Sequence, residues 1–299
     1  MKISKHWWLQ GIIVVALLTT LGILINNLAV NLIRTGLGLS FDWLWRPAGF
    51  ALSEHPLPFE PSDSTARALL MGWLNSLRVI TAGIVLATIL GVVTGSARRS
   101  LNPLLRRLAA LYVGLIRQIP LLLQLLFWYF VAFLGLPSEP LSPVGAILFF
   151  SNQGIHFLGL NLSVEFAAVL LGLSVFTGAS IAEVVRGGLD SVPRGQWEAF
   201  RSLGMNERIG LQRVVLPQAL PAILPALSSQ YLNLAKNSTL AIAVGYADLY
   251  AVSDTTITQT GRAIEGFLLL LMSFLLLNLL INGAMQLLNR AVLRRRKQH

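Results

Sequence analysis

A group of polar residues lies in the middle of the apolar stretch from Ala222 to Tyr246. Lys236 is flanked there by Asn233, Asn237 and Ser238. A helix places residues three and four positions apart on one face, so Asn233, Lys236 and Asn237 would point the same way. Ionisable residues inside a membrane span cost at least ~2.5–3.5 kcal/mol and are functional candidates by default. An ammonium beside amides and a hydroxyl can bind a carboxylate. Alternatively, Lys236 bonds the C-terminal carbonyls of a helix in a neighbouring subunit.

The stretch from Leu111 to Leu136 holds a second pair of polar residues. Arg117 and Gln124 lie two helical turns apart in it. Gln124 is the deeper of the two and is a second candidate to line a pathway. Arg117 lies close to the inner end of the stretch, where its long side chain can reach the interface. We therefore expect Arg117 to be structural.

A third apolar stretch has a polar stripe. Thr177, Ser180 and Glu183 recur every three residues along it. Thr177 is a further candidate for the pathway, although hydroxyls of this kind also serve helix packing. We expect Glu183 to form an ion pair with a nearby arginine such as Arg186.

A charged, helix-compatible segment, residues 198–217, separates two apolar stretches. A negative charge near a helix start, as at Glu198, is favoured by the helix dipole. Gly204 allows the chain to turn back. Ala199, Phe200 and Leu203 would form an apolar face suited to a groove in a partner. Alternatively, the segment is an amphipathic helix on the inner membrane surface.

Composition places the elements that carry these residues in a membrane. The chain has 299 residues, of which 55% are hydrophobic and 12% charged, with a mean hydropathy of +0.67. Soluble proteins have about 25% charged residues. A span needs about 20 apolar residues. Six segments satisfy this: Trp7–Ile33, Gly72–Ala97, Leu111–Leu136, Val164–Val185, Ala222–Tyr246 and Gly266–Leu288.

The basic residues predict the orientation of these spans. With both termini in the cytoplasm, sixteen Lys and Arg lie in inner segments and four in outer loops, as the positive-inside rule requires. Basic residues that lie beside anionic lipid headgroups account for the net charge of +10, so the charge does not require nucleic acid as a partner. The apolar part of residues 141–160 is too short to span the membrane, and we expect this segment to be an interfacial or re-entrant piece on the outer side.

Enzymatic chemistry has no residues to support it. The chain has no cysteine, and its four histidines are isolated from any metal-ligand spacing, so we expect no metal site. It also lacks the G-x-x-x-x-G-K-[ST] motif that binds nucleotide phosphates. We expect no catalytic residues and no cofactor in this chain.

Residues 198–217 resemble the EAA loop of ABC importer permeases, with Phe200 where the family pattern has a second Ala. Further motifs resemble the polar amino-acid (histidine/glutamine-type) branch over roughly residues 68 to 290. They include Asn75-Ser76-Leu77-Arg78, Arg117-Gln118-Ile119-Pro120, Ala182-Glu183-Val184-Val185-Arg186-Gly187-Gly188, Pro217-Gln218-Ala219 and Ser229-Gln230-Tyr231-Leu232-Asn233. The first span and Phe41-Asp42-Trp43-Leu44 resemble the general L-amino-acid subgroup.

This resemblance implies an all-α integral membrane protein of the type I ABC importer permease architecture, with about six spans and a cytoplasmic coupling helix. The implied activity is uptake of polar or broad-range amino acids through the inner membrane. The implied partners are ATPase subunits that bind ATP and Mg²⁺, a second permease subunit, the same or homologous, and a periplasmic binding protein. The residues implied to couple the chain to the ATPase are Glu198, Ala199, Phe200, Gly204, Leu216 and Pro217.

The expected organisation is a first span with a periplasmic loop (1–71), a permease domain (72–290) and a basic cytoplasmic tail (291–299). An ion-coupled secondary amino-acid transporter is the alternative. It predicts an inverted repeat and intramembrane carboxylates, whereas the sequence shows no repeat and only Glu183 as a buried acid.

Overall fold

The computed structural model describes residues 7–34, 38–137, 141–144, 148–157 and 160–296. Lys2, Lys5 and Lys297, used in the charge count, lie outside the described residues. The chain divides into two compact units, Met1–Leu44 and Trp45–His299. The loop before the second predicted span therefore packs with the second unit, whereas the sequence grouped it with the first span.

The first unit contains α1 (Trp7–Arg34), and η1 (Asp42–Trp45) lies at the boundary between the units in sequence. The most apolar window of α1 has a mean hydropathy of 2.3, and none of it is buried. A helix this apolar and this long, at 28 residues, can cross a bilayer. The predicted first span is confirmed as a helix.

The second unit is mainly helical, with a loop before α2 and four strands between η2 and α5. Its helices are α2 (Thr65–Ala97), α3 (Pro103–Ile116), α4 (Leu121–Leu126), η2 (Phe127–Phe133), α5 (Val164–Asp190), α6 (Arg194–Ser202), α7 (Glu207–Gly210), η3 (Leu211–Val215), α8 (Leu216–Asn237), η4 (Ser238–Val244), α9 (Leu249–Thr260) and α10 (Ala263–Arg296).

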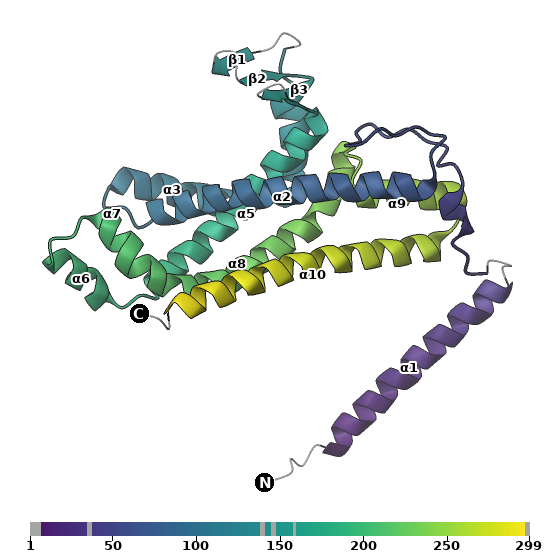
Figure 1. Ribbon diagram of the computed structural model, residues 1–299, viewed down its shortest axis with the longest axis horizontal. Helices are drawn as coiled ribbons and strands as arrows, with labels where there is room; N and C mark the ends of the chain where they lie inside the picture. The colour runs from purple at the N-terminus through teal and green to yellow at the C-terminus, as the bar shows by residue number, and fades with distance from the viewer. Residues whose placement is uncertain (1–6, 35–37, 138–140, 145–147, 158–159, 297–299) are drawn as a thin grey trace. The chain divides into compact units, whose positions relative to one another are not determined.

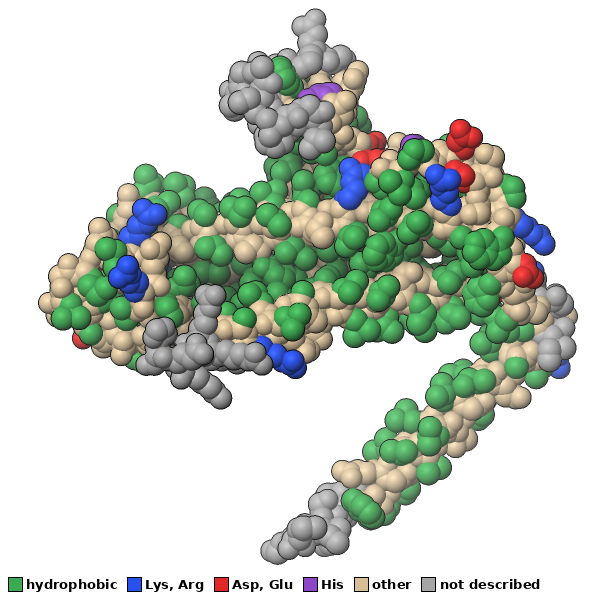
Figure 2. Space-filling model, in the orientation of Figure 1, with side chains coloured by type: hydrophobic (Ala, Val, Ile, Leu, Met, Phe, Trp, Pro, Cys, Tyr) green, Lys and Arg blue, Asp and Glu red, His purple; other side chains and the backbone are tan. Residues whose placement is uncertain are grey.

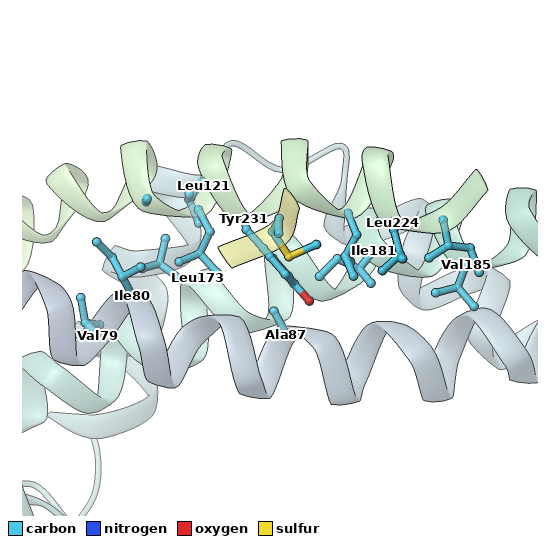
Figure 3. Close-up of a cluster of buried hydrophobic side chains, with 14 of the residues drawn as sticks. Val79, Ile80, Ala87, Leu121, Leu173, Ile181, Val185, Leu224 and Tyr231 are labelled. Atoms are coloured by element: carbon cyan, nitrogen blue, oxygen red, sulfur yellow. The ribbon is translucent and has the colours of Figure 1, made fainter. Parts of the chain in front are cut away.

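The core of this unit lies where α2, α5 and α8 pack together, and α10 packs along α8 (Figure 1). Figure 3 shows its apolar side chains facing one another: Val79, Ile80 and Ala87 from α2, Leu173, Ile181 and Val185 from α5, and Leu224 and Tyr231 from α8. The Tyr231 hydroxyl reaches α2 and hydrogen-bonds Thr88 Oγ1 at 2.7 Å. A buried hydroxyl needs such a partner, so this bond fixes α8 against α2.

Four described helices are long and apolar enough to cross a membrane, Trp7–Leu32, Thr65–Ala97, Val164–Asp190 and Ala263–Val292. The predicted span Leu111–Leu136 is not one continuous helix, because α3 and the run from α4 to η2 pass the length and hydropathy test only together and are bent by 105°. Counted as one broken span, the pair makes five. The predicted span Ala222–Tyr246 is not among them; Gln230, Asn233, Lys236 and Asn237 lower its hydropathy, and it changes from α-helix to 3-10 helix at Ser238.

The described residues of the segment 141–160 form strands and not a span, and its interfacial position stays a prediction. The four strands β1 (Leu141–Val144), β2 (Leu148–Ser151), β3 (Gly154–Phe157) and β4 (Leu160–Leu162) pair in order as an antiparallel meander. Ser151 pairs with Gly154 at the β2–β3 hairpin, where Gly154 has a φ of 125° that favours glycine. A short apolar run flanked by turn residues suits a strand as well as a helix.

Charged side chains are segregated along the second unit. On the face shown in Figure 2, hydrophobic side chains cover the middle of the long helices, and most charged side chains lie toward their ends. This is the distribution expected when lipid surrounds the middle and water meets the ends.

Candidate functional site

Four of the six predicted pathway residues line one pocket of about 370 Å³. Three of them, Asn233, Lys236 and Asn237, come from the last turns of α8, which confirms that they share a face. Thr177 comes from α5. The remaining lining residues are Arg117, Phe176, Ser180 and Gln230. The pocket wall is therefore mainly amides, hydroxyls and cations.

Lys236 lies where α8 ends. Ser238 Oγ donates to the Ala235 carbonyl and Thr239 Oγ1 to the Lys236 carbonyl, each at 2.9 Å. Such bonds compete with the helical pattern, and the chain continues as the 3-10 helix η4. The helix dipole favours a cation in this last turn. Among the described residues, none forms an ion pair with Lys236. Ser238 is buried and does not line the pocket.

Gln124 does not line the pocket either; it holds the bend between α3 and α4. Pro120 has no N–H, so it cannot donate the helical bond that the Ile116 carbonyl would accept. Gln124 Nε2 donates instead to the carbonyls of Ile116, at 2.9 Å, and Ile119, at 3.0 Å. The side chain of Gln124 thereby fixes the backbone on both sides of Arg117.

Arg117 does line the pocket, although the sequence suggested only a structural role for it. It is the C-cap of α3, directly before the bend. The signal available in the sequence was Ile119-Pro120, because the residue before a proline is a common helix boundary. The bend redirects the chain and brings Arg117 to the same pocket as Lys236.

A cluster of ion pairs lies beside the pocket. Glu183 pairs with Arg98 and with Arg186, whose Nη2 is 2.9 Å from Glu183 Oε2. The predicted Glu183–Arg186 pair is confirmed. Asp190 pairs with Arg99 and with Arg186. These contacts join the C-terminal ends of α2 and α5.

The short helix α6 is held by Phe200. This side chain is 1% exposed and belongs to the main core. Its ring lies against Gly210, where an added Cβ would come within 2.2 Å of it. The expectation that Phe200 shares an exposed face with Ala199 and Leu203 is therefore wrong: the spacing gave the helix face but not which side of it meets the core.

Glu198, Ala199 and Leu203 form the outward face of α6, with Leu203 79% exposed. The helix ends at Ser202, and Gly204 follows with a φ of 67° and open space around it, which allows the predicted turn of the chain. Leu216 and Pro217 are exposed at the start of α8, directly after the π-helix η3. Pro217 lacks an N–H for the carbonyl four residues earlier, which is a local reason for the wider π turn.

Contacts connect α6 to the ends of the long helices. The Arg99 guanidinium lies over the Trp197 ring, 4.4 Å from its centroid, and Arg201 lies 5.9 Å from the same ring. Gln218 Nε2 donates to Gln196 Oε1 at 3.1 Å. A displacement of α6 would thus act on Arg99 and on the ion pairs with Asp190.

Comparisons with known proteins place these features in a wider group. Residues 83–294 match the family described as binding-protein-dependent transport system inner membrane component. The putative amino-acid ABC transporter permease YhdX of Escherichia coli K12 is 33% identical over 96% of this chain and 94% of its own length. The general L-amino acid transport system permease AapQ of Rhizobium johnstonii is 34% identical over 80% of each.

Two solved structures have a fold similar to that of this chain. The crystal structure of an amino acid ABC transporter with histidines has a TM-score of 0.60 and 25% identity, covering 76% of this chain and 94% of the other. The methionine ABC transporter MetNI in an inward-facing conformation has a TM-score of 0.60 at 22% identity, covering 79% and 99%. The second likeness shows a shared fold.

Proposed function

The chain belongs to the family of binding-protein-dependent transport system inner membrane components, and from that membership we propose that it is the permease subunit of an ATP-driven ABC importer of amino acids. The names of its relatives support amino acids as the transported class. The observation that carries the proposal is the construction of α6. One side of this helix is fixed in the core through Phe200, and the other presents Glu198, Ala199 and Leu203 to the surroundings.

The proposed division of labour leaves ATP and Mg²⁺ to a separate ATPase subunit, because this chain has no phosphate-binding motif. Its partners are that ATPase, a second permease chain, identical or homologous, and a periplasmic binding protein. The positive-inside asymmetry supports a multi-pass topology with α6, both termini and the basic tail from residue 291 in the cytoplasm. In this topology α8 crosses the membrane in addition to the five candidate spans, because both termini lie on one side only with an even number of spans. The permease domain is residues 72–290.

The proposed mechanism is rigid-body transmission. Movement of the ATPase subunits displaces α6 through Glu198, Ala199, Gly204, Leu216 and Pro217. Phe200 conveys this displacement to the core, and the Trp197–Arg99 contact conveys it to the ends of α2 and α5. Reorientation of these helices exposes the pocket of Lys236 alternately to the two sides. Asn233, Asn237 and Thr177 line the substrate pathway together with Lys236. Gln124 and Ser238 support the backbone around this pathway.

The test is amino-acid uptake by the complete complex in vesicles, with ATP supplied on the ATPase side. Glu198→Lys should reduce uptake at least about tenfold, since a reversed charge at a docking surface costs binding and specificity. The matched control is Glu60→Lys, an exposed carboxylate in the loop before α2, which should retain uptake.

Uptake that continues undiminished in a correctly inserted Glu198→Lys protein would contradict the coupling role of α6. Uptake that persists without ATP and stops when an ionophore collapses the ion gradients would instead identify an ion-coupled secondary transporter.

A further inference from the structure

The pocket of Lys236 carries two cationic side chains from separate elements. Arg117 comes from the end of α3 and Lys236 from the last turn of α8. Of the described residues that line the pocket, none is Asp or Glu. Its volume of about 370 Å³ is in the range of small-molecule sites. Two cations at one small pocket repel each other unless an anion lies between them.

Among the ion pairs beside the pocket, the one that includes Arg117 is long and is not hydrogen-bonded. The Nη1 atom of Arg117 lies 3.9 Å from Glu183 Oε1, which is beyond hydrogen-bond distance. Both oxygens of Glu183 already accept from other arginines, Oε1 from Arg98 and Oε2 from Arg186. Glu183 faces a second, adjoining pocket together with Arg98 and Arg117.

The charge balance of this region is therefore positive. Asp190 pairs with Arg99 and Arg186, as Glu183 does with Arg98 and Arg186. In these pairs two carboxylates bond three arginines, and Arg117 adds a fourth positive charge. Lys236 forms no ion pair with any described residue. Both Arg117 and Lys236 can bind an incoming anion without first breaking a hydrogen-bonded ion pair.

We propose that this pocket selects an amino acid with two carboxylates, one held by Lys236 and the other by Arg117. The inference rests on the proposed function and adds the substrate class. Charge-assisted hydrogen bonds to carboxylates are the stronger class. The amide oxygens of Asn233 and Asn237 and the hydroxyl of Thr177 can accept from the substrate ammonium. A neutral amino acid leaves one cation unpaired, and a basic one adds a third cation, so both are rejected.

The test is equilibrium binding to the complete permease–ATPase complex in nanodiscs, without the binding protein, so that only the membrane pocket selects. The probes are L-glutamate and L-glutamine, which have the same shape and differ by one charge. The wild-type complex should bind glutamate about tenfold or more tighter than glutamine. Arg117→Gln should remove that preference, mainly by weakening glutamate, and Arg117→Lys should retain most of it.

The matched control is Arg106→Gln, an exposed arginine on α3 that does not line the pocket, and it should preserve the preference. Lys236→Gln should weaken glutamate and Lys236→Arg should restore it. Thermal unfolding of each variant shows whether it folds. Equal affinity of the wild-type complex for the two probes, or an unchanged preference in folded Arg117→Gln, overturns this inference alone. A complex that neither binds nor takes up any amino acid overturns the proposed function as well.

Discussion

Phe200 is the residue that fastens α6 to the rest of the protein. Its ring fills the space above Gly210 and contacts the main core. Truncating a buried aromatic side chain costs about 3–5 kcal/mol, so Phe200→Ala should lower the thermal unfolding temperature of the solubilised protein. Leu203→Ala removes a side chain that is 79% exposed and should leave that temperature nearly unchanged.

The two variants also separate stability from coupling. Leu203 belongs to the outward face of α6, so its truncation should reduce ATP-dependent uptake although the fold persists. An unfolding temperature for Phe200→Ala equal to that of the wild type would show that α6 does not depend on this side chain.

Asp248 is a buried acid in the connection before α9, outside the candidate spans. Its Oδ1 caps α9 by accepting from the Ala251 N–H at 2.8 Å, whereas its Oδ2 is buried without a hydrogen-bond partner in the described structure. Burial raises the pKa of this carboxyl from 3.8 to about 7. The folded state therefore holds a proton between those two pH values that the unfolded state has released.

Stability should consequently fall as pH rises from about 4 to about 7 and then level off, by at most ~4 kcal/mol in all. Asp248→Asn keeps an oxygen for the cap and carries no charge, so it should remove this slope. The measurement is thermal unfolding of both proteins at pH 5 and pH 8. If the wild-type protein loses no more stability between pH 5 and pH 8 than the variant does, the raised pKa of Asp248 is contradicted.

At the scale of elements, α2 and α5 approach closely through glycines. An added Cβ at Gly91 would lie 2.4 Å from Ile181 Cγ2 and 3.0 Å from the Gly178 carbonyl. At Gly95 it would lie 2.7 Å from the Ala182 carbonyl. These glycines therefore allow α2 and α5 to pack closely.

Gly91→Ala should therefore destabilise the protein by about 1–3 kcal/mol, the usual cost of overpacking. Gly114→Ala is the control, because a Cβ at Gly114 meets nothing within 4 Å. Comparing the thermal unfolding of the two variants in detergent checks this. Equal unfolding temperatures would mean that α2 and α5 can separate without cost.

Which elements could be predicted depended on what hydropathy measures. Continuous apolar runs identified α1, α2, α5 and α10, because length and composition decide a span. Composition does not record direction, so the bend at Pro120 was missed, and with it the position of Arg117. The spacing of Asn233, Lys236 and Asn237 was sufficient, because they share one uninterrupted helix. The exposure of Phe200 was wrongly predicted, since the sequence pattern of a short amphipathic helix does not indicate which face packs against the rest of the protein.

At the scale of the whole molecule, two polar networks contact α2 at separate levels, one at Arg78 within the helix and one at Arg98, directly after its end. At the first level Arg78 pairs with Glu54 at 3.1 Å, and Ser163 Oγ donates to Glu54 Oε2 at 2.6 Å. At the second level Arg98 pairs with Glu183. Twenty helical residues separate Arg78 from Arg98, which is about 30 Å at 1.5 Å per residue. This equals the thickness of the hydrocarbon core of a bilayer.

That spacing predicts that the loop before α2 and the turn after α6 face opposite sides of the membrane. Because the chain has no cysteine, single cysteines can report this directly. In intact cells a membrane-impermeant maleimide should label Ser62→Cys and leave Asn206→Cys unlabelled until the inner membrane is permeabilised. The positive-inside rule predicts which of the two sides is the cytoplasm, since the basic residues gather on the side of α6.

Asn206 caps α7 by accepting from the Arg208 N–H at 2.9 Å, so Asn206→Cys also loses a cap worth about 1 kcal/mol. Gln212→Cys is an exposed position that leaves this cap in place and should give the same result. If both positions react in intact cells, α6 lies outside. A cytoplasmic ATPase could then not reach Glu198 or Leu203, and the force for transport would have to enter the protein elsewhere.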